Sequence, residues 1–177
     1  MVSPFDFATA QQIIFGAGKA NSIATLAKEL GERALVITGV SNPRVQTLLD
    51  QWQTQGFVAA TLSVNGEPTV NDAIAGTNSA RQANCDSIIA IGGGSVIDTG
   101  KAIAALLTNP GDPLDYLEVV GRGLPLRISS APLIAAPTTA GTGAEVTRNA
   151  VLAVPEKQVK VSLRSPTMLP RIALVEP

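Results

Sequence analysis

The sequence predicts a Rossmann-like α/β fold: a mostly parallel sheet with flanking helices, followed by a C-terminal β-hairpin. Short β-branched strands alternate with amphipathic helices as far as Pro110. Strands joined by crossover helices form parallel sheets that are covered on both faces. Alternating apolar residues at 149–154 and 159–163 predict the hairpin, and the length of 177 residues fits one domain.

Apolar runs and their turn residues set the expected order of elements. The expected strands of the sheet are 12–15, 34–38, 58–64, 87–91, 133–136 and 172–175. Helices are expected at about 21–30, 43–55, 69–83 and 95–107, with a short one at 115–119. A hairpin turn is expected at 121–123, and the C-terminal hairpin is expected to turn at Glu156 and Lys157.

Composition excludes several functional classes. Hydrophobic residues make up 45% and charged residues 15% of the chain, which indicates a buried core. The net charge of −1 gives no electrostatic footprint for nucleic acid or anionic membrane. No apolar run is long enough to span a bilayer, and the first residues do not resemble a signal peptide. Cys85 is the only cysteine, so we expect a reducing, cytoplasmic location.

The sequence contains no histidine. This excludes Ser-His-Asp and Cys-His catalysis, histidine general bases and most transition-metal sites. Any chemistry must therefore use Lys, Asp, Glu, Thr or a bound cofactor.

The most informative segment is a triple-glycine turn. An apolar strand runs into Gly92, Gly93 and Gly94, and a helix is expected to open at Ser95. Glycines allow close approach of a ligand to the backbone, and a helix N-terminus favours a phosphate. We therefore favour anion binding over a plain tight turn. The segment is neither a G-x-G-x-x-G fingerprint, because Ile97 replaces the third glycine, nor a Walker A loop.

Three polar or glycine-rich segments follow predicted strands. They are Gly39, the triple glycine and the threonine-rich stretch 138–142. Ligands of open α/β sheets bind beyond the carboxyl ends of the strands. Together these segments predict a nucleotide site.

Two long motifs carry a resemblance that covers essentially the whole chain. The first is Gly-Gly-Gly-Ser-Val-Ile-Asp at 92–98, and the second is Pro-Thr-Thr-Ala-Gly-Thr-Gly-Ala-Glu-Val-Thr at 137–147. With Ile-Phe-Gly-Ala-Gly at 14–18, and with Asn149 and Lys160 at the expected spacing, they resemble the iron-containing (group III) alcohol dehydrogenase family.

The resemblance implies an NAD(P)-binding α/β domain over 1–177, like the N-terminal domain of dehydroquinate synthase. In the family, a following helical domain binds iron or zinc through an Asp and three His, and the chain ends before any such ligand. The implied activity is hydride transfer between NADP or NAD and a small alcohol or aldehyde, and the family also suggests a homodimer. The chain alone is expected to be inactive. Alternatives are a polyol (glycerol) dehydrogenase-type relative and a free-standing nucleotide-binding module without catalysis.

The resemblance also implies roles for individual residues. Gly92, Gly93, Gly94 and Ser95 would present donors to the pyrophosphate, although Ser95 can also be read as a helix N-cap, with Asp98 completing a capping box. Asp98 lies either near the nicotinamide or in that cap, and the two readings stay open.

Threonines and two later residues complete the expected cofactor site. Of Thr138, Thr139 and Thr142, at least two are expected to contact the cofactor rather than only shape a turn. Asn149 and Lys160 match family positions near the ribose and nicotinamide. A solvated surface lysine remains the alternative for Lys160.

Gly39 departs from the family pattern. Many members have Asp there, and an acid at the end of an early strand binds the ribose 2′-OH and favours NAD. The chain instead has Gly39 followed by Ser41 and Arg44, so a 2′-phosphate would meet no carboxylate. We therefore favour NADP, with a simple turn glycine as the alternative reading.

Overall fold

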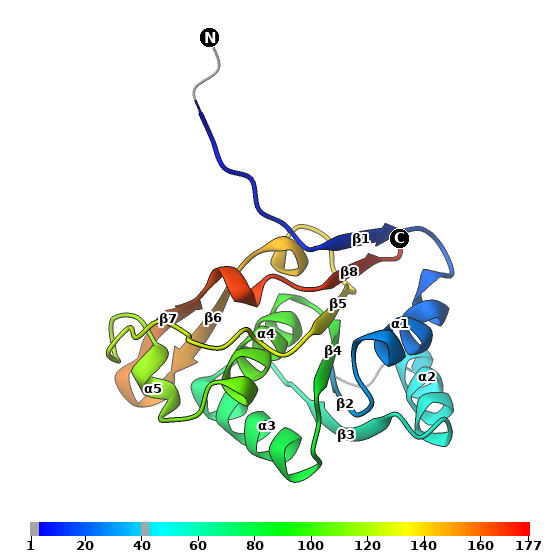
Figure 1. Cartoon of the computed structure of the whole chain (residues 1–177), viewed down its shortest axis with the longest axis horizontal. Coiled ribbons are helices and arrows are strands. Elements are labelled where there is room, and N and C mark those ends of the chain that lie inside the picture. The colour runs from blue at the N-terminus through cyan, green and yellow to red at the C-terminus, as the bar shows by residue number, and fades with distance from the viewer. Residues whose placement is uncertain (1–3, 40–42) are drawn as a thin grey trace.

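The computed structural model describes residues 4–39 and 43–177. Its centre is a six-stranded sheet in which all pairs are parallel, with the order β1-β8-β5-β4-β2-β3 (Figure 1). The strands are β1 (Gln12–Phe15), β2 (Ala34–Thr38), β3 (Val58–Ser63), β4 (Ser87–Gly92), β5 (Leu133–Pro137) and β8 (Ile172–Val175). The Rossmann-like prediction is confirmed.

A helix follows each of the first four strands along the chain, and a short fifth helix follows the fourth helix. They are α1 (Ile23–Leu30), α2 (Pro43–Thr54), α3 (Val70–Gln82), α4 (Gly94–Thr108) and the short α5 (Pro113–Tyr116). Short 3-10 turns occupy Lys19–Ser22, Ala144–Val146, Pro155–Lys157 and Pro166–Met168. Within the described ranges, no helix has the length and apolar character needed to cross a bilayer.

The central strands are apolar on both faces because helices cover both sides of the sheet. In β2, Leu35 and Ile37 enter the core beneath α3 and α4, whereas Val36 enters the core beneath α1 and α2. Figure 1 shows these two helix pairs on opposite sides of the sheet. Since side chains alternate along a strand, each buried strand serves both cores.

A separate hairpin covers the outer side of α4. Strands β6 (Asn149–Val154) and β7 (Val159–Arg164) pair antiparallel, as predicted, and pack on α4 and α5 in a third core (Figure 1). Helix α4 therefore lies between the sheet and the hairpin. This explains why it is apolar almost all round, with ten buried residues.

The structure corrects three local predictions. Helix α4 begins at Gly94 with Gly93 as its N-cap, so Ser95 is not the cap and forms no capping box with Asp98. Helix α5 begins earlier than predicted, because the Asp112 side chain accepts a hydrogen bond from the Leu114 N–H and Pro113 starts the helix. The turn at 121–123 joins no two strands, so it is not a hairpin turn.

Candidate functional site

The sheet changes its winding direction between β2 and β4. The chain leaves β2 toward β3 through α2 on one face, and leaves β4 toward β5 through α4 on the other. A crevice opens at such a point, outside the carboxyl ends of the strands. Gly39 follows β2 there, and a Cβ built on it would lie 3.6 Å from Val96 Cγ2 near the start of α4.

The glycine turn brings β4 directly into α4. A Cβ on Gly92 would lie 2.5 Å from Val96 Cγ2, so this position requires glycine. Gly93 is the N-cap, and its carbonyl accepts hydrogen bonds from Val96 N–H (3.0 Å) and Ile97 N–H (3.2 Å). The first N–H groups of a helix have no partner within it and carry partial positive charge. Gly94 and Ser95 supply such groups.

The threonine loop, residues 138–147, lies against this turn. Its start is fixed by a hydrogen bond from Thr138 N–H to the Gly92 carbonyl (3.0 Å). A Cβ on Gly93 would lie 3.4 Å from Thr139 Oγ1, and one on Gly94 would lie 3.1 Å from Thr142 Cγ2. The two motifs, far apart in sequence, therefore form one surface.

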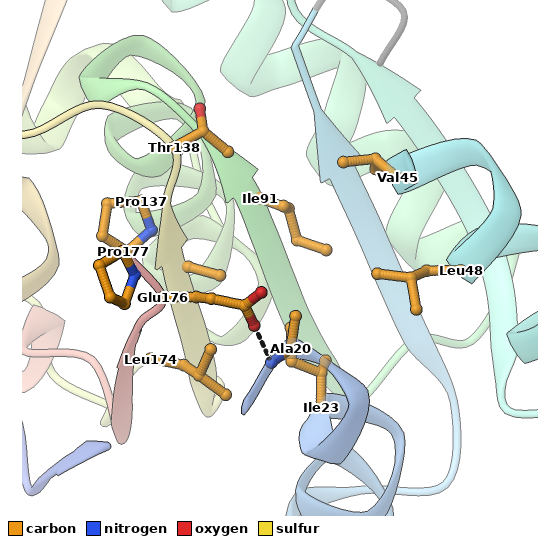
Figure 2. Close-up of a pocket in the computed structure, with 11 residues that line it drawn as sticks. Ala20, Ile23, Val45, Leu48, Ile91, Pro137, Thr138, Leu174, Glu176 and Pro177 are labelled. Carbon is orange, nitrogen blue, oxygen red and sulfur yellow. Dashed lines mark hydrogen bonds between the residues drawn. The ribbon is translucent and has the colours of Figure 1, made fainter. Parts of the chain in front are cut away.

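Thr138 faces a pocket beside the turn. The pocket has a volume of about 280 Å³ and lies between α1, α2 and the ends of β4, β5 and β8. Figure 2 shows its mainly apolar wall: Ala20, Ile23, Val45, Leu48, Ile91, Ala136, Pro137 and Leu174. Among the described residues of the lining, Glu176 is the acidic one, and its Oε2 accepts a hydrogen bond from Ala20 N–H (2.7 Å).

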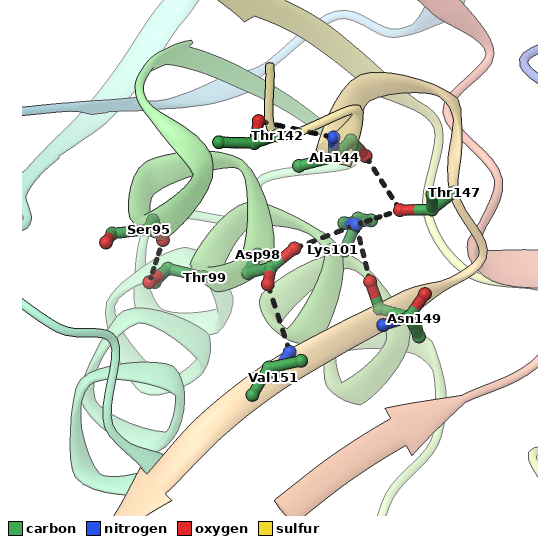
Figure 3. A network of polar contacts seen from close by, with 9 residues as sticks. All are labelled: Ser95, Asp98, Thr99, Lys101, Thr142, Ala144, Thr147, Asn149 and Val151. Carbon is green, nitrogen blue, oxygen red and sulfur yellow. Dashed lines mark hydrogen bonds and ion pairs between the residues drawn. The ribbon is translucent and has the colours of Figure 1, made fainter. Parts of the chain in front are cut away.

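Behind the threonine loop lies a buried ion pair on α4. Lys101, whose side chain is 0% exposed, places Nζ 2.8 Å from Asp98 Oδ1 (Figure 3). Lys101 Nζ also donates to Thr147 Oγ1 (3.1 Å) and to the Asn149 carbonyl. Burial lowers the pKa of Lys101 below its usual value, and the charges of Asp98 and Glu145 oppose that shift.

Asp98 has a second partner, the N–H of Val151, at 3.1 Å (Figure 3). It therefore joins α4 to β6 instead of capping its own helix. Asn149 belongs to the same contact through its carbonyl. Their predicted roles beside the cofactor stay predictions.

The predicted site residues thus form two groups and one outlier. Gly39, the glycine turn with Ser95, and the three threonines lie at the carboxyl ends of β2, β4 and β5, and Thr138 also lines the pocket. Asp98 and Asn149 lie where α4 meets β6. Lys160 is 60% exposed on β7 and pairs with Glu67, which follows β3. Ser41 and the side chain of Arg44 lie outside what the structure describes.

The sequence analysis did not predict Lys101 and Thr147 as residues of the site. The available signal was a lysine inside the apolar run of α4, three residues after an aspartate. A charged residue in a helix that is apolar all round needs a buried partner. The structure adds two partners from segments packed on α4: Thr147 at the end of the threonine loop and Asn149 at the start of β6.

The described residues do not fit a metal ion. No cluster of three or more His, Cys, Asp or Glu side chains occurs in residues 4–39 and 43–177. Cys85 is buried, and burial raises the pKa of its thiol.

The fold and cleft define a doubly wound α/β domain of the class that places ligands at a switch point between parallel strands. Residues 10–177 match the family described as iron-containing alcohol dehydrogenase. The chain belongs to this family.

Individual relatives agree with the assignment. Mitochondrial hydroxyacid-oxoacid transhydrogenase of Bos taurus is 32% identical over 172 residues, which cover 93% of this chain and 37% of the relative. The 4-hydroxybutyrate dehydrogenase of Cupriavidus necator is 41% identical over 97 residues, 55% of this chain and 25% of the relative. The crystal structure of sulfoacetaldehyde reductase from Bifidobacterium kashiwanohense with NAD+ superposes with a TM-score of 0.83 at 27% identity, covering 99% of this chain and 47% of the other. The chain thus spans less than half the length of these relatives.

Proposed function

We propose that the chain is the cofactor-binding part of an oxidoreductase that transfers hydride between NAD(P) and a small alcohol or aldehyde. The observation that carries this proposal is the contact between the glycine turn and the threonine loop at the switch point of the sheet. Family membership supports it, as does the NAD+ named with the sulfoacetaldehyde reductase structure. The substrate class is supported by relatives named for a hydroxyacid and an aldehyde.

The chain's own residues suit the parts of a dinucleotide. Gly93, Gly94 and Ser95 would hold the pyrophosphate at the N-terminus of α4, where backbone donors and the helix dipole favour negative charge. The apolar pocket beside Thr138 would bind a nucleobase of the dinucleotide. When bound, the nicotinamide carries the hydride, and the chain supplies position and electrostatics.

Purified chain should bind a nicotinamide dinucleotide without sustained turnover. The test is a titration with NADH and NADPH, followed by cofactor fluorescence, together with an assay for alcohol-dependent reduction of NAD and NADP. We expect saturable binding and no steady reduction. If the chain binds neither cofactor, the proposal is contradicted. Steady turnover would contradict the expected inactivity of the chain alone.

A free-standing nucleotide-binding module is the second candidate. The contact between the glycine turn and the threonine loop would serve such a module equally, since it would hold a nucleotide whether or not a substrate is bound. Reading the gene beyond the codon for Pro177 distinguishes the two. An open frame encoding an Asp and three His supports the enzyme, and a stop codon supports the module.

We further propose that NADP is preferred over NAD. Gly39 offers no carboxylate to repel a 2′-phosphate, and a Cβ built on it would meet only Val96 within 4 Å. Packing therefore does not require glycine at position 39, so the proposed role of Gly39 concerns the ligand. The cytoplasmic location, the homodimer and the roles of Ser41 and Lys160 stay predictions.

A further inference from the structure

We infer that Lys101 is a positioning residue that holds the threonine loop in the shape that receives a dinucleotide. The inference rests on the proposed cofactor-binding function and deepens it. Lys101 itself is fully buried behind the loop, so it acts through the residues that it holds.

The ammonium group of Lys101 has three N–H donors, and three acceptors surround it. They are Asp98 Oδ1 from its own helix, Thr147 Oγ1 from the end of the loop, and the Asn149 carbonyl at the start of β6 (Figure 3). Thr147 Oγ1 in turn donates to the Ala144 carbonyl at 3.3 Å. The network therefore extends from α4 into the loop itself.

The loop is anchored at two ends by different means. Its start continues β5 and is held by the Thr138 hydrogen bond to the glycine turn. Its far end is held by Lys101. Between them, Gly141 (φ +107°) and Gly143 (φ +63°) adopt positive φ angles. Because glycine restricts the backbone less than other residues do, the local sequence alone does not fix the shape of the loop. Thr142, which packs on Gly94, lies between these glycines, so its position depends on both anchors.

A buried ammonium is a costly way to stabilise a helix. Apart from Asp98 and Thr99, the neighbours of Lys101 on α4 are apolar, and an apolar side chain would avoid the loss of solvation. An apolar side chain would, however, leave Asp98, Thr147 and the Asn149 carbonyl without their shared donor. Lys101 therefore serves the geometry of the contact between α4, the loop and β6 rather than simple burial.

The two anchors hold different parts of the proposed cofactor site, so loss of one anchor should affect some ligands more than others. The pocket at Thr138 depends on the β5 anchor, whereas Thr142 and Asp98 lie on the Lys101 side of the glycine turn. Loss of Lys101 should weaken a full dinucleotide, which needs both sides. It should affect ADP much less, because ADP fills only the pocket and the turn.

The test compares Lys101→Met with Asn109→Ala in the 177-residue chain. Asn109 is a matched control because it is buried, ends the same helix and holds a different loop through Arg127 and Ile128. Kd values are measured for NADH, NADPH and ADP, and the unfolding free energy is measured by denaturant titration. For Lys101→Met we expect the dinucleotide Kd to rise about tenfold or more, the size expected from lost charge-assisted hydrogen bonds, with the ADP Kd within about threefold.

Asn109→Ala should lower the unfolding free energy while leaving all three Kd values near those of the original chain. Equal dinucleotide affinity in Lys101→Met, or equal losses for ADP and dinucleotide, overturns the inference. If Lys101→Met does not fold, Thr147→Val decides: it keeps the lysine and removes one acceptor, and it should show the same selective loss on a smaller scale. An unchanged pattern in Thr147→Val then overturns the inference. If the original chain binds ADP but no dinucleotide, the proposed function itself fails.

Discussion

Asp98 and Lys101, three residues apart on α4, form an ion pair of 2.8 Å beneath the threonine loop. The lysine is fully buried, and the aspartate side chain is 17% exposed. Each residue also bonds to the chain around β6, through Val151 and Asn149 respectively. The pair therefore connects the helix that starts at the glycine turn with the hairpin that covers it.

Stability should depend on pH through Lys101. Burial lowers its pKa in the folded chain below the unfolded value, so the unfolded state binds more protons between the two values. The contribution of Lys101 to the unfolding free energy is therefore complete above the unfolded pKa, near 10.5, and is lost as pH falls through the lowered folded value. Denaturant unfolding of the original chain and of Lys101→Met across the alkaline range gives this contribution as a difference. A difference that stays constant or falls with rising pH contradicts the assignment.

Two glycine substitutions should separate packing from ligand binding. Gly92→Ala places a Cβ 2.5 Å from Val96 Cγ2, so we expect a loss of about 1–3 kcal/mol in unfolding free energy. Gly93→Ala meets only Thr139, at 3.4 Å and beyond, so the expected cost is that of alanine at the N-cap, about 1 kcal/mol or less. If the turn binds the pyrophosphate, Gly93→Ala should still weaken dinucleotide binding. Unchanged affinity would mean that the segment is a plain turn at this position.

Cofactor choice should respond to Gly39→Asp. A carboxylate at this position would accept a hydrogen bond from a ribose 2′-OH and repel a 2′-phosphate. Charge-assisted contacts contribute about 1.5–3 kcal/mol each, which corresponds to roughly one to two orders of magnitude in affinity. We expect the original chain to bind NADPH more tightly than NADH and the variant to reverse that order. Gly39→Ala is the uncharged control, and tighter NADH binding by the original chain would disprove the preference.

The start of α3 gives a prediction that is independent of the cofactor site. Thr69 Oγ1 accepts from Asp72 N–H (3.0 Å), and Asp72 Oδ2 accepts from Thr69 N–H (3.0 Å), which is a complete capping box. Thr69→Ala should lower the unfolding free energy by about 1 kcal/mol. Thr69→Ser keeps the hydroxyl and should recover most of the loss. Trp52, the only tryptophan and buried in the core, supplies a fluorescence signal for these unfolding curves.

Local pattern was enough to place most of the fold. β1, β2 and β8 have the bounds that the sequence predicts. In β2, residues 34–37 are all apolar and buried, which is typical of a central strand. The glycine turn and the threonine loop were also placed correctly at strand ends. In each case, the information lies in residues that are neighbours along the chain.

The start of α4 and the partners of its charged residues depended on tertiary structure. The helix begins at Gly94 rather than Ser95, and Asp98 accepts from Val151 N–H on β6 instead of forming a capping box. Lys101 reaches Asn149 across 48 residues of sequence, and Asp98 reaches Val151 across 53. No local periodicity encodes such contacts, because they exist only once the hairpin packs on α4 and removes water from the lysine. Burial of that charge is a property of the assembled core.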